Sequence, residues 1–413
     1  MRRMRGFSLV EMMIAIVLGL LVTDALVSMF VGVRSASHTS SGVASLSDGG
    51  RFALDTIEQS VRGAGDMACN SSAPMAVAGV PITRQISLLN AGASELISWV
   101  GGPPAGMNPL PGGEPLAGYE AANTSPGQVV MVSATPAADA AAADWLAIPL
   151  LGSNLDAALT NPPVPTGMAA PVGSMVAGSD VLVVNQTRMG AAPVYTTNVA
   201  TGAGSFLVDT NTGFSPGQIA VISNCVQSEV FEIGSFAPSG STGAIGLPGA
   251  PAPGNTSNTL SSNIDFTIGS HVAVVDTVIF YIGIGTDGDG ALYKYETNGG
   301  VLGDAFSVNQ ELVPDVENMQ ILYGVENATT QTTQTVAQYV TADQVAGASL
   351  TGDFNGVISV KIALLVATPP GAVPVATATS PPTLLGTDWH VTVPDSRMRK
   401  VYEQTIFLRN MSP

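Results

Sequence analysis

A single carboxylate, Glu11, stands near the start of a long apolar run. The residues from Met12 to Val22 carry neither a charge nor a hydroxyl group, and the apolar character continues to about Val33. An unpaired carboxylate at the centre of a bilayer costs about 2.5–3.5 kcal/mol, so Glu11 needs a cation if this run enters a membrane. These residues therefore predict an ion pair within an apolar phase.

The residues before Glu11 indicate where that cation comes from. They are three arginines followed by a Gly-Phe pair: Arg2, Arg3, Arg5, Gly6 and Phe7. With Glu11, this Gly-Phe-x-x-x-Glu frame resembles the class III signal of type IV prepilins. The resemblance implies that a prepilin peptidase cuts after Gly6 and methylates Phe7, whose freed amine pairs with Glu11 of the same or a neighbouring subunit. The alternative is an ordinary signal anchor with an incidental glutamate.

The apolar run is long enough to cross a membrane. A helix from Phe7 to Val33, rising about 1.5 Å per residue, spans a hydrocarbon core of about 30 Å. Arginines before the run and none inside it predict a cytoplasmic N-terminus and a head outside the inner membrane. Asp24 falls near the outer interface, where we expect a solvated carboxylate.

The two cysteines of the chain, Cys69 and Cys225, are far apart in sequence. Outside the inner membrane they can form one disulfide. Such a bond would stabilise the chain by about 4–5 kcal/mol in the chain-entropy model. Two unpaired thiols are the alternative.

Two short segments match sequence motifs that are typical of cofactor binding or catalysis. GIGTDG (283–288) fits Gly-x-Gly-x-x-Gly, but a strand-like segment follows it where dinucleotide binding needs a helix, so we expect a hairpin turn. Asp287 and Asp289 suggest calcium, but the EF-hand frame is not met and Asp-Gly turns explain the stretch. GFSPG (213–217) resembles a nucleophile elbow, yet Pro216 lacks the backbone N–H needed for an oxyanion hole. We expect a turn there as well.

The rest of the composition argues against an enzyme. His38, His271 and His390 are isolated, and the sequence has no His-Glu-x-x-His, Cys-x-x-Cys or Walker loop. We therefore expect no catalytic residues, no metal and no cofactor. The formal charge of −17, from 14 basic and 31 acidic residues, argues against nucleic acid as a partner because phosphate binding needs clustered Lys and Arg.

A second helical segment follows the apolar run. In GRFALDTIEQSVRGAG (50–65), Leu54, Ile57 and Val61 share one helical face, and the following glycines are a stop signal. We expect one long helix from Phe7 to about Arg62, bent at Gly49-Gly50, with its second half against a globular head.

From residue 73 onward the pattern is typical of β structure, because short runs rich in Val, Ile, Phe and Tyr alternate with Gly, Pro, Asn and Asp. We predict strands within 128–134, 180–185, 205–210, 218–225, 229–236, 271–284, 291–297, 318–326, 357–368 and 401–410. Low-complexity spacers at 135–143, 237–262 and 368–382 are predicted to be surface loops.

Two further stretches carry a family resemblance. GRFALDTIEQSVRGAGDMAC (50–69) resembles a segment of PilW-type minor pilins. LVPDVENMQILYGVE (312–326), VISVKIALLVAT (357–368), RMRK (397–400) and FLRN (407–410) resemble the closing order of the same family. Residues 90–260 resemble no family.

The resemblance implies an α+β, type IV pilin-like fold, in which a long N-terminal helix packs on a large β-rich head. The expected parts are a leader (1–6), a transmembrane and assembly helix (7–33), its amphipathic continuation (34–65) and the head (66–413). The implied function is a minor pilin that primes or caps the type IV pilus. Its partners would be prepilin peptidase, other minor pilins, the major pilin and the inner membrane. A type II secretion pseudopilin and a tip adhesin acting through 90–260 are the alternatives.

Overall fold

The computed structural model describes fifteen segments of the chain, and every structural statement below concerns them. They are residues 9–71, 75–77, 80–82, 85–88, 115–132, 173–188, 193–200, 202–247, 255–262, 264–300, 306–326, 335–348, 354–373, 382–391 and 395–408. Gly6 and Phe7 lie outside these segments, so the predicted processing site is not described.

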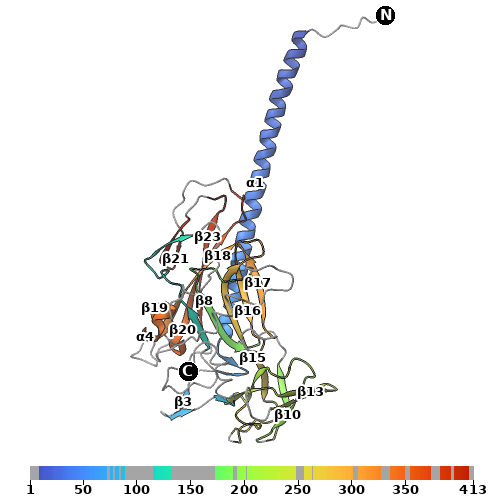
Figure 1. The fold of residues 1–413 in the computed structure, drawn as a ribbon, viewed down its shortest axis with the longest axis vertical. Coiled ribbons are helices and arrows are strands. Elements are labelled where there is room, and N and C mark those ends of the chain that lie inside the picture. Colours follow the sequence, from blue (N-terminus) through green and yellow to red (C-terminus); the bar gives the residue numbers. More distant parts are fainter. Residues whose placement is uncertain are drawn as a thin grey trace, which may run out of the picture.

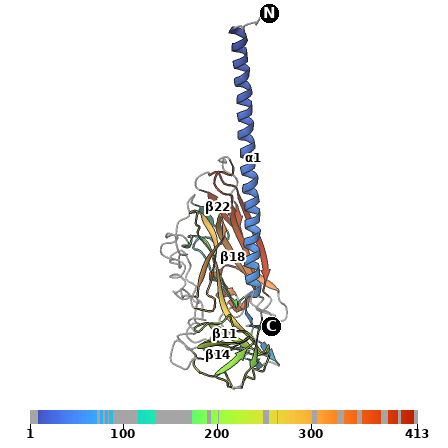
Figure 2. The ribbon, with the colours of Figure 1, turned by 90° about the vertical axis from the view of Figure 1, so that its right-hand side faces the viewer.

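One long helix, α1 (Leu9–Gly63), dominates the shape of the molecule. It projects far beyond the head at its N-terminal end and then runs along one side of the head (Figures 1 and 2). The predicted helix is confirmed over the described residues, but it continues without a break through Gly49 and Gly50, where a bend was expected. Gly65, with φ +73°, follows its end in the left-handed region that favours glycine.

The largest sheet has 12 strands, organised on the long strand β15 (His271–Ile284). The first half of β15 pairs with β9 (Val194–Asn198) and β11 (Ile219–Ser223), and its second half pairs with β8 (Val181–Thr187) and β16 (Gly290–Glu296). The strands farther out are β5 (Gln85–Ser87), β6 (Leu116–Tyr119), β10 (Ser205–Val208), β12 (Ser228–Glu232), β13 (Ser235–Ser239), β14 (Thr242–Gly246) and β17 (Val308–Pro314).

A second sheet has the order β19-β18-β20-β23 and is antiparallel throughout. Its strands are β18 (Val316–Glu326), β19 (Val336–Val340), β20 (Val357–Ala367) and β23 (Arg399–Phe407). Short elements complete the head: β1 (Asp66–Met67), β2 (Asn70–Ser71), β3 (Met75–Val77), β4 (Val80–Ile82), β7 (Val129–Val132), β21 (Thr383–Leu384), β22 (Thr387–Val391), η1 (Ala342–Gln344), α4 (Val345–Ala348) and η2 (Phe354–Gly356).

The head has two main hydrophobic cores. The larger core joins the buried face of α1 to the second half of β15 and to the second sheet. The smaller core lies among β10, β11, β12 and the first residues of β15, and it includes Phe206, Phe231 and Phe266. We call the part built on the smaller core the distal lobe, residues 194–247 and 255–274. Figure 1 places β10 and β13 of this lobe at the end of the molecule farthest from the N-terminus.

Strands occur within all ten predicted segments, and segment 229–236 contains parts of two, β12 and β13. The prediction of a surface loop at 237–262 is wrong for residues 237–246, because β13 extends to Ser239 and pairs with β14 in a hairpin. Alternate residues of β14, Gly243 and Ile245, are buried, although its Gly- and Ala-rich composition gives little β signal. The spacer at 135–143 and residues 374–381 of the last spacer lie outside the described segments.

Candidate assembly site

The N-terminal half of α1 is not packed against the head. Every residue from Leu9 to Val33 is exposed. The exposed large apolar side chains in this half are Leu9, Val10, Met12, Met13, Ile14, Ile16, Val17, Leu18, Leu20, Leu21, Val22, Leu26, Val27, Met29, Phe30, Val31 and Val33. Within the described residues, α1 is the helix long and apolar enough to cross a membrane. Burial of so much apolar surface requires lipid or other helices.

Glu11 lies on α1 among these apolar side chains, and its residue is exposed. Asp24 lies thirteen residues further along the same exposed half. Glu11, the acid of the expected Phe7–Glu11 pair, therefore lies in a helix, as predicted. Gly6 and Phe7 are outside the described residues.

The C-terminal half of α1 is fixed to the head by one apolar face. Leu46, Ala53, Ile57 and Val61 are buried there, and their spacings of seven, four and four residues keep them on one side of the helix. They join the larger core together with β17, β20 and β23. The half-buried Glu58 pairs with Arg62 one turn later and accepts a hydrogen bond from Gln404 of β23.

Close approach of α1 to β23 depends on Gly50. A Cβ at this position would lie 2.5 Å from the ring atoms of Tyr402. The sequence predicted a bend at Gly49-Gly50. In the structure, the missing side chain of Gly50 lets the aromatic ring of Tyr402 pack against the helix backbone.

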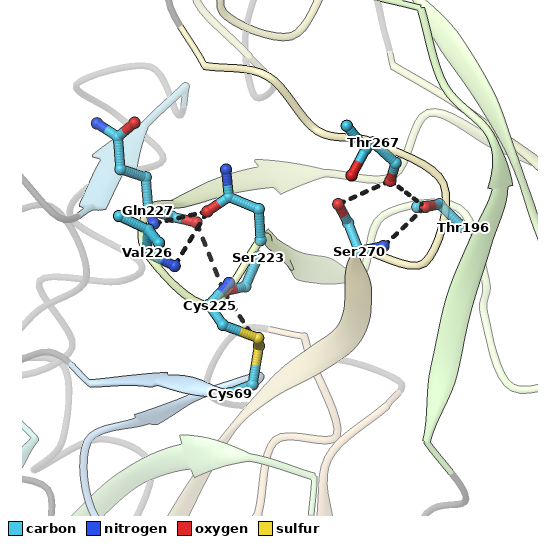
Figure 3. The surroundings of a disulfide bond; sticks show 9 residues. Cys69, Thr196, Ser223, Cys225, Val226, Gln227, Thr267 and Ser270 are labelled. Atoms are coloured by element: carbon cyan, nitrogen blue, oxygen red, sulfur yellow. Dashed lines mark hydrogen bonds between the residues drawn. A yellow bond between two sulfur atoms is a disulfide. The ribbon is translucent and has the colours of Figure 1, made fainter.

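Cys69 and Cys225 form a disulfide, with their Cα atoms 5.0 Å apart (Figure 3). Cys69 follows β1, just after the end of α1, and Cys225 lies in the turn between β11 and β12. The bond therefore attaches the distal lobe to the segment that follows α1. Of the two possibilities considered from the sequence, a disulfide and two unpaired thiols, the structure shows the disulfide.

The Asp-Gly loop after β15 is a hairpin turn, as expected. Gly285 donates its N–H to the carbonyl of Asp289 at 2.7 Å, and β16 follows in register with β15. No helix opens after GIGTDG, so the loop lacks the helix N-terminus that holds a dinucleotide phosphate. GFSPG is likewise a turn that leads into β11, where the N–H of Ser215 donates to Gln218 Oε1 at 2.8 Å.

The same Asp-Gly loop meets a basic strand from the end of the chain. Arg397, whose side chain is 8% exposed, pairs with Asp289 and lies 3.4 Å from Asp315. Arg399 pairs with Glu317 through two hydrogen bonds of 2.6 and 2.8 Å, and it also contacts Asp395. Sequence reasoning noted the basic stretch 397–400 but missed these partners, because about 80 to 110 residues separate most of them from the arginines.

Two buried carboxyl groups lie between the sheets, and sequence reasoning missed both. Asp180 accepts hydrogen bonds from the N–H groups of Ala121 (2.9 Å) and Ile321 (2.8 Å). Burial raises the pKa of Asp180 to about 7. Burial, together with the charges of Asp180 and Asp343, raises the pKa of Glu120 to about 9. The two hydrogen bonds of Asp180 join the segment after β6 to β18 and indicate that this side chain helps to hold the sheets together.

Two protein-family models match the chain. Residues 279–410 match the family Type IV Pilus-assembly protein W (PilW), and residues 1–23 match the prokaryotic N-terminal methylation motif. No curated protein and no solved structure matches the chain. The two matches confirm the resemblance to PilW-type pilins with a prepilin signal. They cover the second half of β15, the strands that follow it and the start of α1, whereas the distal lobe before residue 279 lies outside both.

Proposed function

We propose that this chain is a minor pilin that is cleaved after Gly6, methylated at Phe7 and assembled with other minor pilins to prime or cap a type IV pilus. The observation that carries the proposal is the division of α1. One half is packed into the head, and the other half presents apolar side chains on all sides with one acid near its beginning. A helix of this kind is stored in lipid before assembly and packs against other helices afterwards.

The pairing of Phe7 with Glu11 provides the proposed assembly mechanism. Cleavage creates an amine four residues before Glu11, which is one helical turn and therefore within reach of its carboxylate. In the membrane this pair would offset the cost of a lone charge. During assembly, the same carboxylate could receive the amine of a neighbouring subunit, which would set how far adjacent helices are displaced along their axes.

The proposed location follows from the same division of α1. The processing signal precedes the apolar half, so prepilin peptidase and the inner membrane are the first partners. Other minor pilins and the major pilin would then contact the apolar half. The head would stand in the periplasm until assembly carries it to the pilus, and its size suits a tip subunit better than a repeating shaft subunit.

A second candidate function, adhesion at the pilus tip, is favoured by the distal lobe. This lobe has its own core, lies at the end of the head farthest from the membrane half of α1, and falls outside the family match. A type II secretion pseudopilin would share the processing signal, but the match to the pilus-assembly family favours the pilus.

The mass and the N-terminal residue of the protein isolated from its native membrane test the proposal. We expect a chain that begins at N-methylated Phe7. An uncut chain that retains Met1 to Gly6 in cells making normal pili would contradict the proposal.

The variant Glu11→Ala tests the pairing mechanism. We expect normal cleavage but few or no pili, because the new amine has lost its carboxylate. Asp24→Ala is the matched control, since it removes another exposed acid from the same half of α1 and should leave pilus number unchanged. Normal pilus numbers in Glu11→Ala would exclude the mechanism.

A further inference from the structure

The Cys69–Cys225 disulfide lies at the surface of the head and outside its two main cores. Both cysteines are exposed, and neither belongs to the buried apolar side chains of either core. Thiol–disulfide exchange begins when a thiolate attacks one of the two sulfur atoms, and its rate depends on access to that atom. The position of this bond therefore leaves it open to an external thiol (Figure 3).

The backbone at both ends of the bond is in the left-handed region. Cys69 has a φ of +71° and Cys225 has a φ of +66°, and Ala68, just before Cys69, has a φ of +49°. Residues with a side chain rarely adopt such angles and keep them only where the surrounding structure holds them. The disulfide is one of the bonds that hold these two residues, so its opening would let the backbone relax at each end.

Two polar side chains of the distal lobe lie beside the sulfur atoms. Ser223 Oγ lies 3.7 Å from Cys69 Sγ, and the hydroxyl is the donor of this contact because a disulfide sulfur carries no hydrogen. The same oxygen accepts the N–H of Cys225 at 3.1 Å, which fixes its position. A ring nitrogen of His271 lies within 4.8 Å of both sulfur atoms. A hydroxyl and an imidazole can both stabilise a thiolate that forms when the bond opens.

We propose that Cys69–Cys225 is an exchangeable disulfide, which a dithiol protein outside the inner membrane opens. A thiolate of the dithiol attacks Cys225 Sγ, the S–S bond breaks, and Cys69 leaves as a thiolate that the Ser223 hydroxyl stabilises. The second thiol of the dithiol, once deprotonated, attacks its own partner sulfur in the mixed disulfide and releases the thiolate of Cys225. The chain thus gains two electrons, its two thiolates take up two protons, and the dithiol becomes a disulfide.

The opening of this bond would change how the distal lobe is attached. The lobe would keep its continuity with the rest of the head through β15, and it would lose its covalent link to the segment after α1. The exchange therefore acts as a redox switch on this link. It requires only that the head lies outside the inner membrane, and it goes beyond the proposed role in pilus assembly.

The first test is the reduction of the folded full chain by dithiothreitol in detergent micelles, followed by alkylation of the free thiols and mass spectrometry. We expect a rate of reduction that does not change when urea is added below the unfolding transition, because the exposed bond opens without unfolding of the head. A rate that rises with urea in parallel with the unfolding rate would overturn the proposal, since the bond would then open only in unfolded chains.

The second test identifies the sulfur atom that is attacked. Glutathione has a single thiol, so a rapid acid quench preserves its mixed disulfide with the chain. We expect mass spectrometry of the digested chain to find glutathione on Cys225 and a free thiol on Cys69. Glutathione on Cys69 would overturn the assignment of Cys69 as the leaving group.

Ser223→Ala tests the role of the hydroxyl. We expect the exchange to slow by about threefold or more, because a leaving thiolate that is less stable leaves more slowly. Ser239→Ala is the matched control, since it removes an exposed hydroxyl of β13 and should leave the rate unchanged. An unchanged rate in Ser223→Ala, or equal slowing in both variants, would overturn the proposal. Glutathione trapping on the unaltered chain remains decisive if Ser223→Ala does not fold.

Discussion

At the scale of single residues, the interior of the head contains carboxyl groups in unusual positions. The carboxylate of Asp180 accepts one backbone hydrogen bond from the segment after β6 and another from β18, so it joins two sheets. Glu120, at 1% exposure, receives only long contacts from Thr124 and Ser125 on Oε1, and its Oε2 has no hydrogen-bond partner among the described residues. A buried acid with so few donors is more stable when it is protonated.

This arrangement predicts that the head is less stable in alkaline solution. Burial raises the pKa of Glu120 to about 9 and that of Asp180 to about 7, so the folded state holds more protons than the unfolded state above about pH 4. The free energy of unfolding should therefore fall as the pH rises, through about pH 7 for Asp180 and on to about pH 9 for Glu120. Thermal unfolding measured between pH 5 and pH 9 checks this.

Glu120→Gln is the informative variant for this pH dependence. The amide keeps the shape of the side chain and an oxygen acceptor, but it cannot ionise. We expect its unfolding temperature to decline less between pH 7 and pH 9 than that of the wild-type chain. A decline of equal size in both proteins would show that Glu120 is not the group responsible.

At the scale of elements, the disulfide connects two parts of the head that are far apart in sequence. The distal lobe is continuous with the rest of the head through β15, whose first half pairs with β9 and β11 and whose second half pairs with β8 and β16. The Cys69–Cys225 bond adds a covalent connection from the segment just after α1 to the β11–β12 turn (Figure 3). The bond therefore adds a covalent route by which a force on the distal lobe would reach the segment after α1.

Removal of the disulfide should destabilise the distal lobe more than the rest of the head. The bond closes a sequence separation of 156 residues, for which the chain-entropy model gives about 4–5 kcal/mol. We expect the Cys69→Ser, Cys225→Ser double variant to lose hydrogen-exchange protection first in β11 and β12. The reduced wild-type chain should behave in the same way, and equal loss in β18 and β20 would contradict a local role.

Elements with a strong local pattern could be predicted from the sequence. The strands β15 and β20 have long runs of Val, Ile and Leu, and α1 has an apolar run followed by a three- and four-residue repeat. The β13–β14 hairpin was taken for a loop because Gly, Ala, Ser and Pro give little β signal, and pairing with β10 decides its structure. The contacts of Arg397 with Asp289 and Asp315 could not be predicted, because tertiary folding alone brings these residues together.

At the scale of the whole molecule, the head and the membrane half of α1 are independent in their packing. The first buried residue of α1 is Gly42, and the first contact with the head that we identify is the hydrogen bond from Thr39 Oγ1 to the carbonyl of Ala372, at 2.7 Å. Residues 9–33 contribute nothing to the two main cores. The stability of the head should therefore not depend on the apolar half of the helix, whereas the proposed assembly depends on it.

A chain that begins at Arg34 should accordingly fold as a soluble, monomeric head. It keeps Thr39, Leu46 and the buried face of α1 and loses only the exposed apolar surface. We expect its unfolding temperature to lie within about 2–4 °C of that of the full chain in detergent, which is the shift that about 1 kcal/mol produces in a domain of about 150–250 residues. Sedimentation should give a monomer, because the surface that drives association is gone. A large loss of stability, or persistent oligomers, would mean that residues 9–33 support the head directly, and the division of α1 that underlies the proposed function would then be wrong.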